Sequence, residues 1–139
     1  MGAGIFFLRY TLPVIAWASL IFLLCTIKSE NIPSVFFLQI VGLDKIAHGF
    51  FYLIWAFLLL RLFNKVENKH FSNYAVIWSL VICVFYGLTI ELLQETVFTY
   101  RSAEWMDAVA NTVGALFGII LFKQNFGVSK LMKKKLSYI

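Results

Sequence analysis

Four stretches of this chain are apolar for nearly the length that a helix needs to cross a lipid bilayer. An α-helix spans the hydrocarbon core with about 20 mostly apolar residues. The chain has 139 residues, of which 61% are hydrophobic and only 14% charged, so a soluble fold could not bury its apolar surface. We therefore predict an all-α integral membrane protein, a bundle of four transmembrane helices over Tyr10–Ile27, Ile46–Phe63, Tyr74–Leu93 and Trp105–Phe122.

The basic residues are distributed unevenly between the two sides that these four spans define. Short loops on the cytoplasmic side of a membrane are enriched in Lys and Arg. If both termini are cytoplasmic, nine of the twelve basic residues lie inside, and only Lys28, Lys45 and Arg101 lie outside. We therefore predict a multi-pass protein of the cytoplasmic membrane with both termini inside. The basic tail over residues 123–139 then faces the anionic inner leaflet, and we expect no contact with nucleic acid.

The sequence indicates a single membrane domain over residues 1–139, since it has no internal repeat and no low-complexity tract. The apolar segment Ser34–Leu43 in the first outer loop is too short to span the bilayer. We predict that it is a short interfacial or re-entrant segment. Cys25 and Cys83 fall at different depths, and we expect no disulfide between them.

Polar and charged residues gather at one end of three of the predicted spans. A charged side chain at the centre of a bilayer costs about 2.5–3.5 kcal/mol on insertion scales. Helical spacing places these residues on one face of each helix, because residues three or four apart are neighbours. The second span opens with Asp44, Lys45 and His48, the third ends with Glu91 and Gln94, and the fourth opens with Asp107 and Asn111 after Arg101 in the preceding loop.

Glycines continue two of these polar faces deeper into the bilayer. Gly87 lies one turn before Glu91, and Gly114 and Gly118 follow Asn111 with a small-xxx-small spacing. This spacing is typical of close helix packing in membranes, so the faces that carry it point at other helices. We therefore predict that the three polar faces converge into one outward-facing pocket.

Each polar residue also has an ordinary structural explanation when it is taken alone. Asp44 is in position to cap the second helix, and Lys45 is in position to extend its ammonium to the head groups. Glu91 could be solvated at its helix end, and Arg101 could pair with an acid or a lipid phosphate. Asn111 could hold helices together by hydrogen bonds. None of these explanations accounts for the gathering of such groups on three helices.

Two segments carry a longer pattern: "DKIAHGFFYLIWAFLL" and "YGLTIELLQETVFTYRSAEWMDAVANTVGALFGIIL". They contain an Asp-Lys-x-x-His opening, a Glu-x-x-Gln at a later helix end, an Arg in the next loop and then Asp-x-x-x-Asn-x-x-Gly. This pattern, in a motif region over residues 43–122, resembles that of the VanZ-like family of small membrane proteins. The founding member, an accessory protein of glycopeptide-resistance clusters, gives low-level resistance to teicoplanin. The resemblance therefore implies a role in teicoplanin resistance, while no established reaction comes with the family.

Three functions remain open for the predicted pocket. The first is binding of a membrane lipid head group, a cell-wall lipid precursor or the glycopeptide itself, with Ser34–Leu43 covering an acyl chain. The second is an intramembrane enzyme, in which His48 and neighbouring carboxylates hold a divalent metal or act as acid and base. The third is a scaffold that fixes helix register. We place binding first and expect neither a cofactor nor a metal, because HExxH, CxxC and Gly-x-Ser-x-Gly motifs are absent. No oligomeric state is predicted.

Overall fold

Every element in the described part of the chain is a helix, and four helices are long and apolar enough to cross a membrane. The computed structural model describes residues 2–26, 43–97 and 104–136, with side chains up to Asn125. The prediction of an all-α protein with four spanning helices is confirmed. Of the predicted interfacial segment Ser34–Leu43, only Leu43 lies within the described residues. The candidate spans are Ala3–Thr26, Leu43–Phe63, Ala75–Thr96 and Trp105–Asn125.

The first span combines three helical segments: α1 (Ala3–Phe6), the π-helical segment η1 (Phe7–Thr11) and α2 (Leu12–Thr26). Pro13 has no backbone N–H and so cannot donate to the carbonyl one turn before it. The wider hydrogen-bond pattern of η1 lies directly before this proline, where such a donor is missing. The span begins earlier than predicted because the apolar residues before Tyr10 continue the helix.

The second and fourth spans, α3 (Leu43–Phe63) and α6 (Trp105–Leu136), form the most extensive helix pair. Both helices include the polar residues at their starts. Without these residues, their apolar parts would be shorter than the roughly 20 residues that cross a bilayer. Asp44 and Lys45 lie in the first turn of α3. The third span, α5 (Ala75–Thr96), contacts both helices and follows the short α4 (Lys69–Asn73). Helix α6 continues past its apolar part into the basic tail, up to Leu136.

Glycines allow the backbones of α3 and α6 to touch. A Cβ on Gly114 would overlap the backbone carbonyl of Gly49, and a Cβ on Gly118 would overlap that of Leu53. Any larger residue at these positions of α6 would push the two helices apart. This contact fixes which faces of α3 and α6 meet, and therefore which polar side chains lie opposite one another.

Helix α2 is attached to the other helices by hydrogen bonds from aromatic side chains. Trp55 Nε1 donates to the carbonyl of Val14 at 3.2 Å, and Tyr86 donates its hydroxyl hydrogen to the carbonyl of Ala18 at 2.8 Å. Trp17 Nε1 donates to the carbonyl of Phe51 at 2.9 Å. These bonds satisfy polar atoms in a region where lipid offers no partner.

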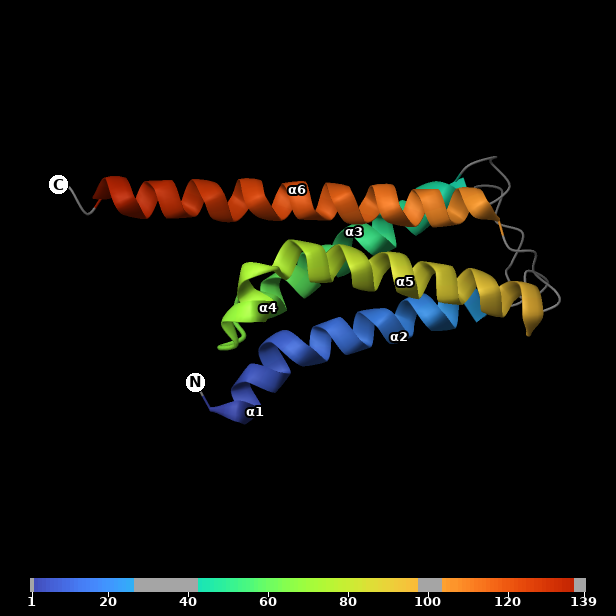
Figure 1. The fold of residues 1–139 in the computed structure, drawn as a ribbon, viewed down its shortest axis with the longest axis horizontal. Coiled ribbons are helices and arrows are strands. Elements are labelled where there is room, and N and C mark those ends of the chain that lie inside the picture. The colour runs from blue at the N-terminus through green and yellow to red at the C-terminus, as the bar shows by residue number, and fades with distance from the viewer. Residues whose placement is uncertain (1, 27–42, 98–103, 137–139) are drawn as a thin grey trace.

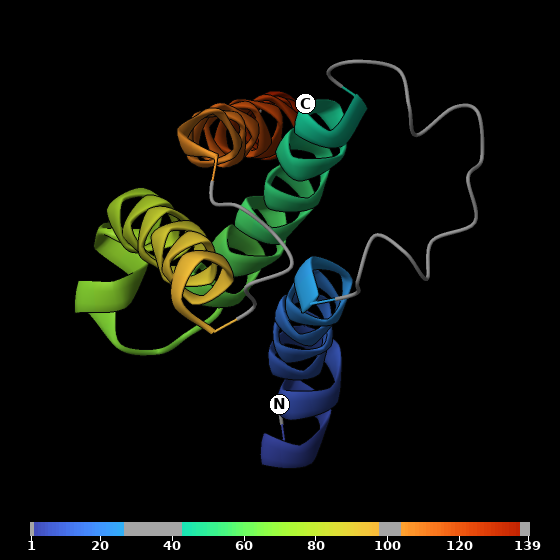
Figure 2. The ribbon, with the colours of Figure 1, turned by 90° about the vertical axis from the view of Figure 1, so that its right-hand side faces the viewer.

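The starts of α3 and α6 and the end of α5 lie at one end of the bundle, which we call the polar end (Figure 1). The N-terminal end of α1 and the C-terminal end of α6 lie toward the opposite end (Figure 1). Viewed from the polar end, α3 crosses the middle of the bundle, with α6 above it, α2 below it and α5 to its left (Figure 2). Cys25 and Cys83 are both buried and form no disulfide.

Candidate functional site

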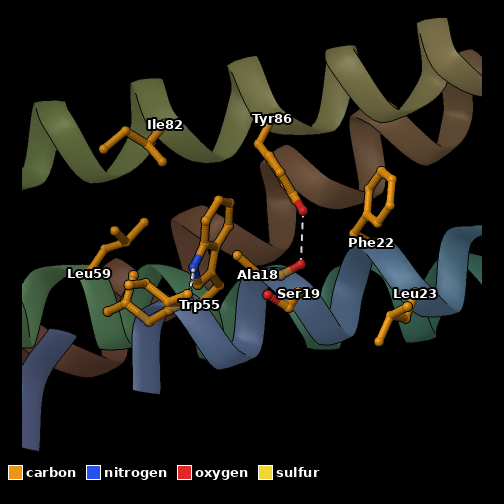
Figure 3. Close-up of a pocket in the computed structure, with 10 residues that line it drawn as sticks. Ala18, Ser19, Phe22, Leu23, Trp55, Leu59, Ile82 and Tyr86 are labelled. Atoms are coloured by element: carbon orange, nitrogen blue, oxygen red, sulfur yellow. Dashed lines mark hydrogen bonds between the residues drawn. The ribbon is translucent and has the colours of Figure 1, made fainter. Parts of the chain in front are cut away.

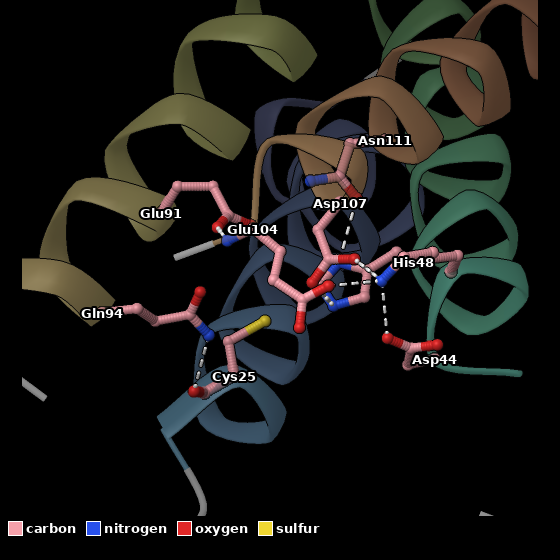
Figure 4. A network of polar contacts seen from close by, with 9 residues as sticks. Cys25, Asp44, His48, Glu91, Gln94, Glu104, Asp107 and Asn111 are labelled. Carbon is pink, nitrogen blue, oxygen red and sulfur yellow. Dashed lines mark hydrogen bonds and ion pairs between the residues drawn. The ribbon is translucent and has the colours of Figure 1, made fainter. Parts of the chain in front are cut away.

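The polar end holds a group of polar side chains that three helices bring to one place (Figure 4). We call this group the polar cluster. It includes all but one of the polar residues singled out in the sequence, together with Glu104. The remaining one, Arg101, lies outside the described residues. The members of the polar cluster are Asp44, Lys45, His48, Glu91, Gln94, Glu104, Asp107 and Asn111.

The ammonium of Lys45 lies at the centre of the polar cluster, among three carboxylates. Its Nζ is 2.8 Å from Asp44 Oδ2, 2.7 Å from Glu104 Oε2 and 3.0 Å from Asp107 Oδ1. All three ammonium hydrogens therefore have an acceptor. Lys45 joins α3 to the start of α6. Asp44 lies one residue inside α3, and its carboxylate accepts a hydrogen bond from the Lys45 ammonium.

His48 forms a second link between α3 and α6, one turn deeper than Lys45. Its Nδ1 is 3.1 Å from Asn111 Oδ1, and its Nε2 is 3.5 Å from Asp107 Oδ2. An amide oxygen only accepts hydrogen bonds, so with Asn111 in this orientation the Nδ1 of His48 carries a proton. His48, Asp107 and Asn111 are all buried. One carboxylate, that of Asp107, thus faces both Lys45 and His48.

The two members from α5 connect the polar cluster to different neighbours. Glu91 Oε2 accepts a hydrogen bond of 3.0 Å from the backbone N–H of Glu104, which ties α5 to the start of α6. Gln94 Nε2 donates to the backbone carbonyl of Cys25 at 3.2 Å, which ties α5 to the end of α2. Both side chains are buried. Glu91 therefore contacts the backbone just before α6, while Gln94 contacts the end of α2.

Below the polar cluster, Gly87 leaves room for two polar side chains. A Cβ at this position would lie 3.1 Å from Asn111 Nδ2 and 3.4 Å from the hydroxyl of Tyr52. The Tyr52 hydroxyl is buried and makes no hydrogen bond within the described part of the chain. Gly87 thus lets Asn111 and Tyr52 approach α5 closely.

The family model described as VanZ/LLP1 matches residues 6–128 of this sequence, which include every member of the polar cluster. The chain belongs to the VanZ/LLP1 family. The resemblance inferred from the sequence motifs is thereby confirmed. Comparisons with curated proteins and with solved structures gave no match.

Glu104 is the one member of the polar cluster that lies outside the sequence motifs described above. It directly precedes α6, and its backbone carbonyl accepts a hydrogen bond of 2.8 Å from the N–H of Asp107. Its carboxylate contacts Lys45, and its own N–H contacts Glu91. The signal that could have identified it is its spacing of three residues from Asp107, which places both acids on one side of the helix start.

Three carboxylates of this VanZ/LLP1 member lie close enough together to form a cation site. One oxygen from each of Asp44, Glu104 and Asp107 lies within 4.8 Å of the others. Carboxylate oxygens suit hard divalent cations. The Lys45 ammonium, however, is within hydrogen-bond distance of all three. A metal ion bound by these three carboxylates would have to displace Lys45. In this structure the three carboxylates bind the Lys45 ammonium.

Proposed function

We propose that this VanZ/LLP1 protein binds, through its polar cluster, the head of an acyl-bearing ligand at the outer face of the cytoplasmic membrane. The observation that carries the proposal is the meeting of charged side chains from three helices where the His48 and Asp107 side chains are only 9% and 10% exposed. Burying charge is expensive in a membrane, and ionisable residues retained there are a sign of a functional site. The candidate ligands are a membrane lipid, a lipid-linked cell-wall precursor and a lipoglycopeptide.

The charge of the polar end favours a ligand that carries an amine. The sequence places six acids and three bases at this end, which leaves a net charge of −3 when all of them are ionised. The contacts of Lys45 with Asp44, Glu104 and Asp107 are those that a primary amine makes with carboxylates. A ligand amine would compete with Lys45 for these oxygens. The displaced Lys45 would then be available to a phosphate or carboxylate of the same ligand.

The family supplies a more specific candidate for the ligand. The resemblance to the teicoplanin-resistance accessory protein supports a contribution to tolerance of glycopeptides that carry an acyl chain. Such a drug enters the membrane surface through its chain, with about 0.8 kcal/mol for each buried CH₂ group. A binding site at that surface has access to the inserted drug and to the lipid-linked precursors that it targets.

The position of His48 favours catalysis as the second candidate function. The two ring nitrogens of His48 are held by α6, because Nδ1 lies 3.1 Å from Asn111 Oδ1 and Nε2 lies 3.5 Å from Asp107 Oδ2. A histidine oriented in this way is a suitable general base for a hydroxyl of a lipid-linked substrate. Under this alternative, His48→Gln abolishes turnover of a bound substrate while leaving its affinity nearly unchanged.

Native mass spectrometry of the purified protein with lipids of different head groups tests the binding proposal. We expect ethanolamine phospholipid to be retained in preference to choline and glycerol phospholipids, since a primary amine can donate to the carboxylates. Asp107→Asn should weaken this retention about tenfold, because it removes a charge-assisted hydrogen bond. Glu67→Gln is the matched control, since Glu67 is exposed and lies between α3 and α4, away from the polar end.

Two results would count against the polar cluster as the site. One is equal retention of the three head groups by the parent protein together with no effect of lipid-linked precursor or lipoglycopeptide in the same assay. The other is equal retention of the preferred ligand by the parent and by Asp107→Asn at equal folded yield.

A further inference from the structure

An apolar groove lies between α2, α3 and α5, separate from the polar cluster (Figure 3). Its volume is about 580 Å³. One wall is the face of α2 from Val14 to Leu23, and the other walls include Trp55 and Leu59 of α3 and Ile82 and Tyr86 of α5. All of these residues belong to candidate membrane spans, so the medium around the groove is the interior of the bilayer.

The chemistry of the walls matches a hydrocarbon chain. The polar atoms of the two large aromatic side chains are hydrogen-bonded to the backbone of α2. Trp55 donates to the carbonyl of Val14, and Tyr86 donates to the carbonyl of Ala18. Both therefore present ring carbons to the groove (Figure 3). A head group or a chain of water molecules would find little to bond with there, whereas an acyl chain needs no such partner.

The groove leads toward the polar cluster. Along α2 it extends over ten residues from Val14 to Leu23, or about 14 Å at 1.5 Å per residue. Leu23 lies two residues before Cys25, whose carbonyl accepts the hydrogen bond from Gln94 of the polar cluster. The upper end of the groove is thus within one helical turn of Cys25, the residue that Gln94 contacts. A single molecule with a head at the polar end can place a chain in the groove.

We propose that this groove holds one acyl chain of a membrane lipid. The further step, that the same lipid has its head at the polar cluster, rests on the proposed function. The groove gives the chain contacts on three helices. The site would therefore select its ligand by an acyl chain as well as by a head group.

Photocrosslinking in vesicles of a choline phospholipid with a mid-chain diazirine tests the groove by itself, since this head group lacks a primary amine. We expect the parent protein to be labelled at Trp55, although that residue is only 4% exposed, and also at the lipid-facing Phe85, which is 71% exposed. Ser19→Phe on α2 or Ile82→Phe on α5 should fill the groove and remove at least 80% of the label on Trp55. Leu20→Phe is the matched control, because Leu20 is next to Ser19 but does not line the groove. Phe85 should remain labelled in every variant.

Labelling of Phe85 without Trp55 in the parent would overturn the groove proposal. Equal labelling of Trp55 in the parent and in both filling variants would also overturn it. Neither result affects the comparison of the parent with Asp107→Asn, which tests the head-group site separately.

Discussion

At the scale of single residues, Lys45 holds the polar end together by balancing the charge of the neighbouring acids. This side chain supplies the one ammonium that the described residues place among Asp44, Glu104 and Asp107. The Asp107 side chain is 10% exposed, so water does little to screen it from the other two acids. Leaving a buried charge without its partner is more costly than never having the pair. The lysine therefore keeps the start of α6 against the start of α3.

The first prediction is that Lys45→Met lowers the midpoint of thermal unfolding in detergent by about 5 °C or more, because three carboxylates then face one another without a cation. Lys45→Arg should recover part of the loss, since it retains the charge. The control is Lys65→Met, an exposed position just after α3. Equal midpoints for Lys45→Met and Lys65→Met would show that the three ion pairs contribute nothing to stability.

At the scale of the helices, the contact between α3 and α6 sets the geometry of the polar cluster. Gly114 and Gly118 bring the α6 backbone against Gly49 and Leu53 of α3. Asn111 and Asp107 lie on α6 above these glycines, and they reach His48 and Lys45 only because the helices are so close. The packing in the apolar region and the contacts at the polar end are therefore coupled.

The second prediction concerns this helix contact. Gly114→Ala should destabilise the protein by about 3 kcal/mol, at the upper end for overpacked cores, because the new Cβ overlaps a backbone carbonyl that cannot move by itself. It should also weaken ligand retention, since α6 carries Asp107. Gly4→Ala is the matched control, because a Cβ there meets no atom within 4 Å. Unfolding in detergent measures both variants, and equal stability would exclude close backbone packing of α3 and α6.

The helices could be predicted from the sequence because a bilayer restricts which backbone structures can cross it. Backbone polar groups in lipid must bond within their own segment, so long apolar stretches become helices. Helical spacing also predicted the faces that carry Asp44, His48, Asp107 and Asn111. The partner of each side chain was not predictable, because it depends on the relative depth and rotation of the helices. For this reason the bond from Gln94 to α2, the role of Glu104 and the apolar groove emerged only from the structure.

At the scale of the whole molecule, the orientation in the membrane decides which side the polar cluster faces. The third prediction is that the polar end is outside, as the distribution of Lys and Arg indicates. In a variant with Cys25 and Cys83 replaced by Ala, a cysteine at the exposed Val97 should react with an impermeant thiol reagent in intact cells. A cysteine at the exposed Asn73 of α4 should react only after the cells are opened. The opposite pattern would place the polar cluster in the cytoplasm.

The fourth prediction concerns resistance. Expression in a susceptible Gram-positive host should raise the inhibitory concentration of teicoplanin at least twofold and leave that of vancomycin nearly unchanged, because only teicoplanin carries an acyl chain that enters the membrane. Asp107→Asn and Glu91→Gln should remove the effect, and Glu67→Gln should keep it at equal membrane abundance. If the parent changes neither drug, this VanZ/LLP1 member has no part in glycopeptide resistance, and its ligand is to be sought among membrane lipids.

The most direct measurement of the central claim, that the polar cluster binds a ligand head, is an experimental structure of the protein in a lipid bilayer. We predict a head group within hydrogen-bond distance of Asp107 and Lys45, with Lys45 having given up at least one of its three carboxylates. One acyl chain should descend from that head past Phe22 toward Trp55. Lys45 still bonded to Asp44, Glu104 and Asp107, with lipids confined to the outer faces of the bundle, would contradict the claim.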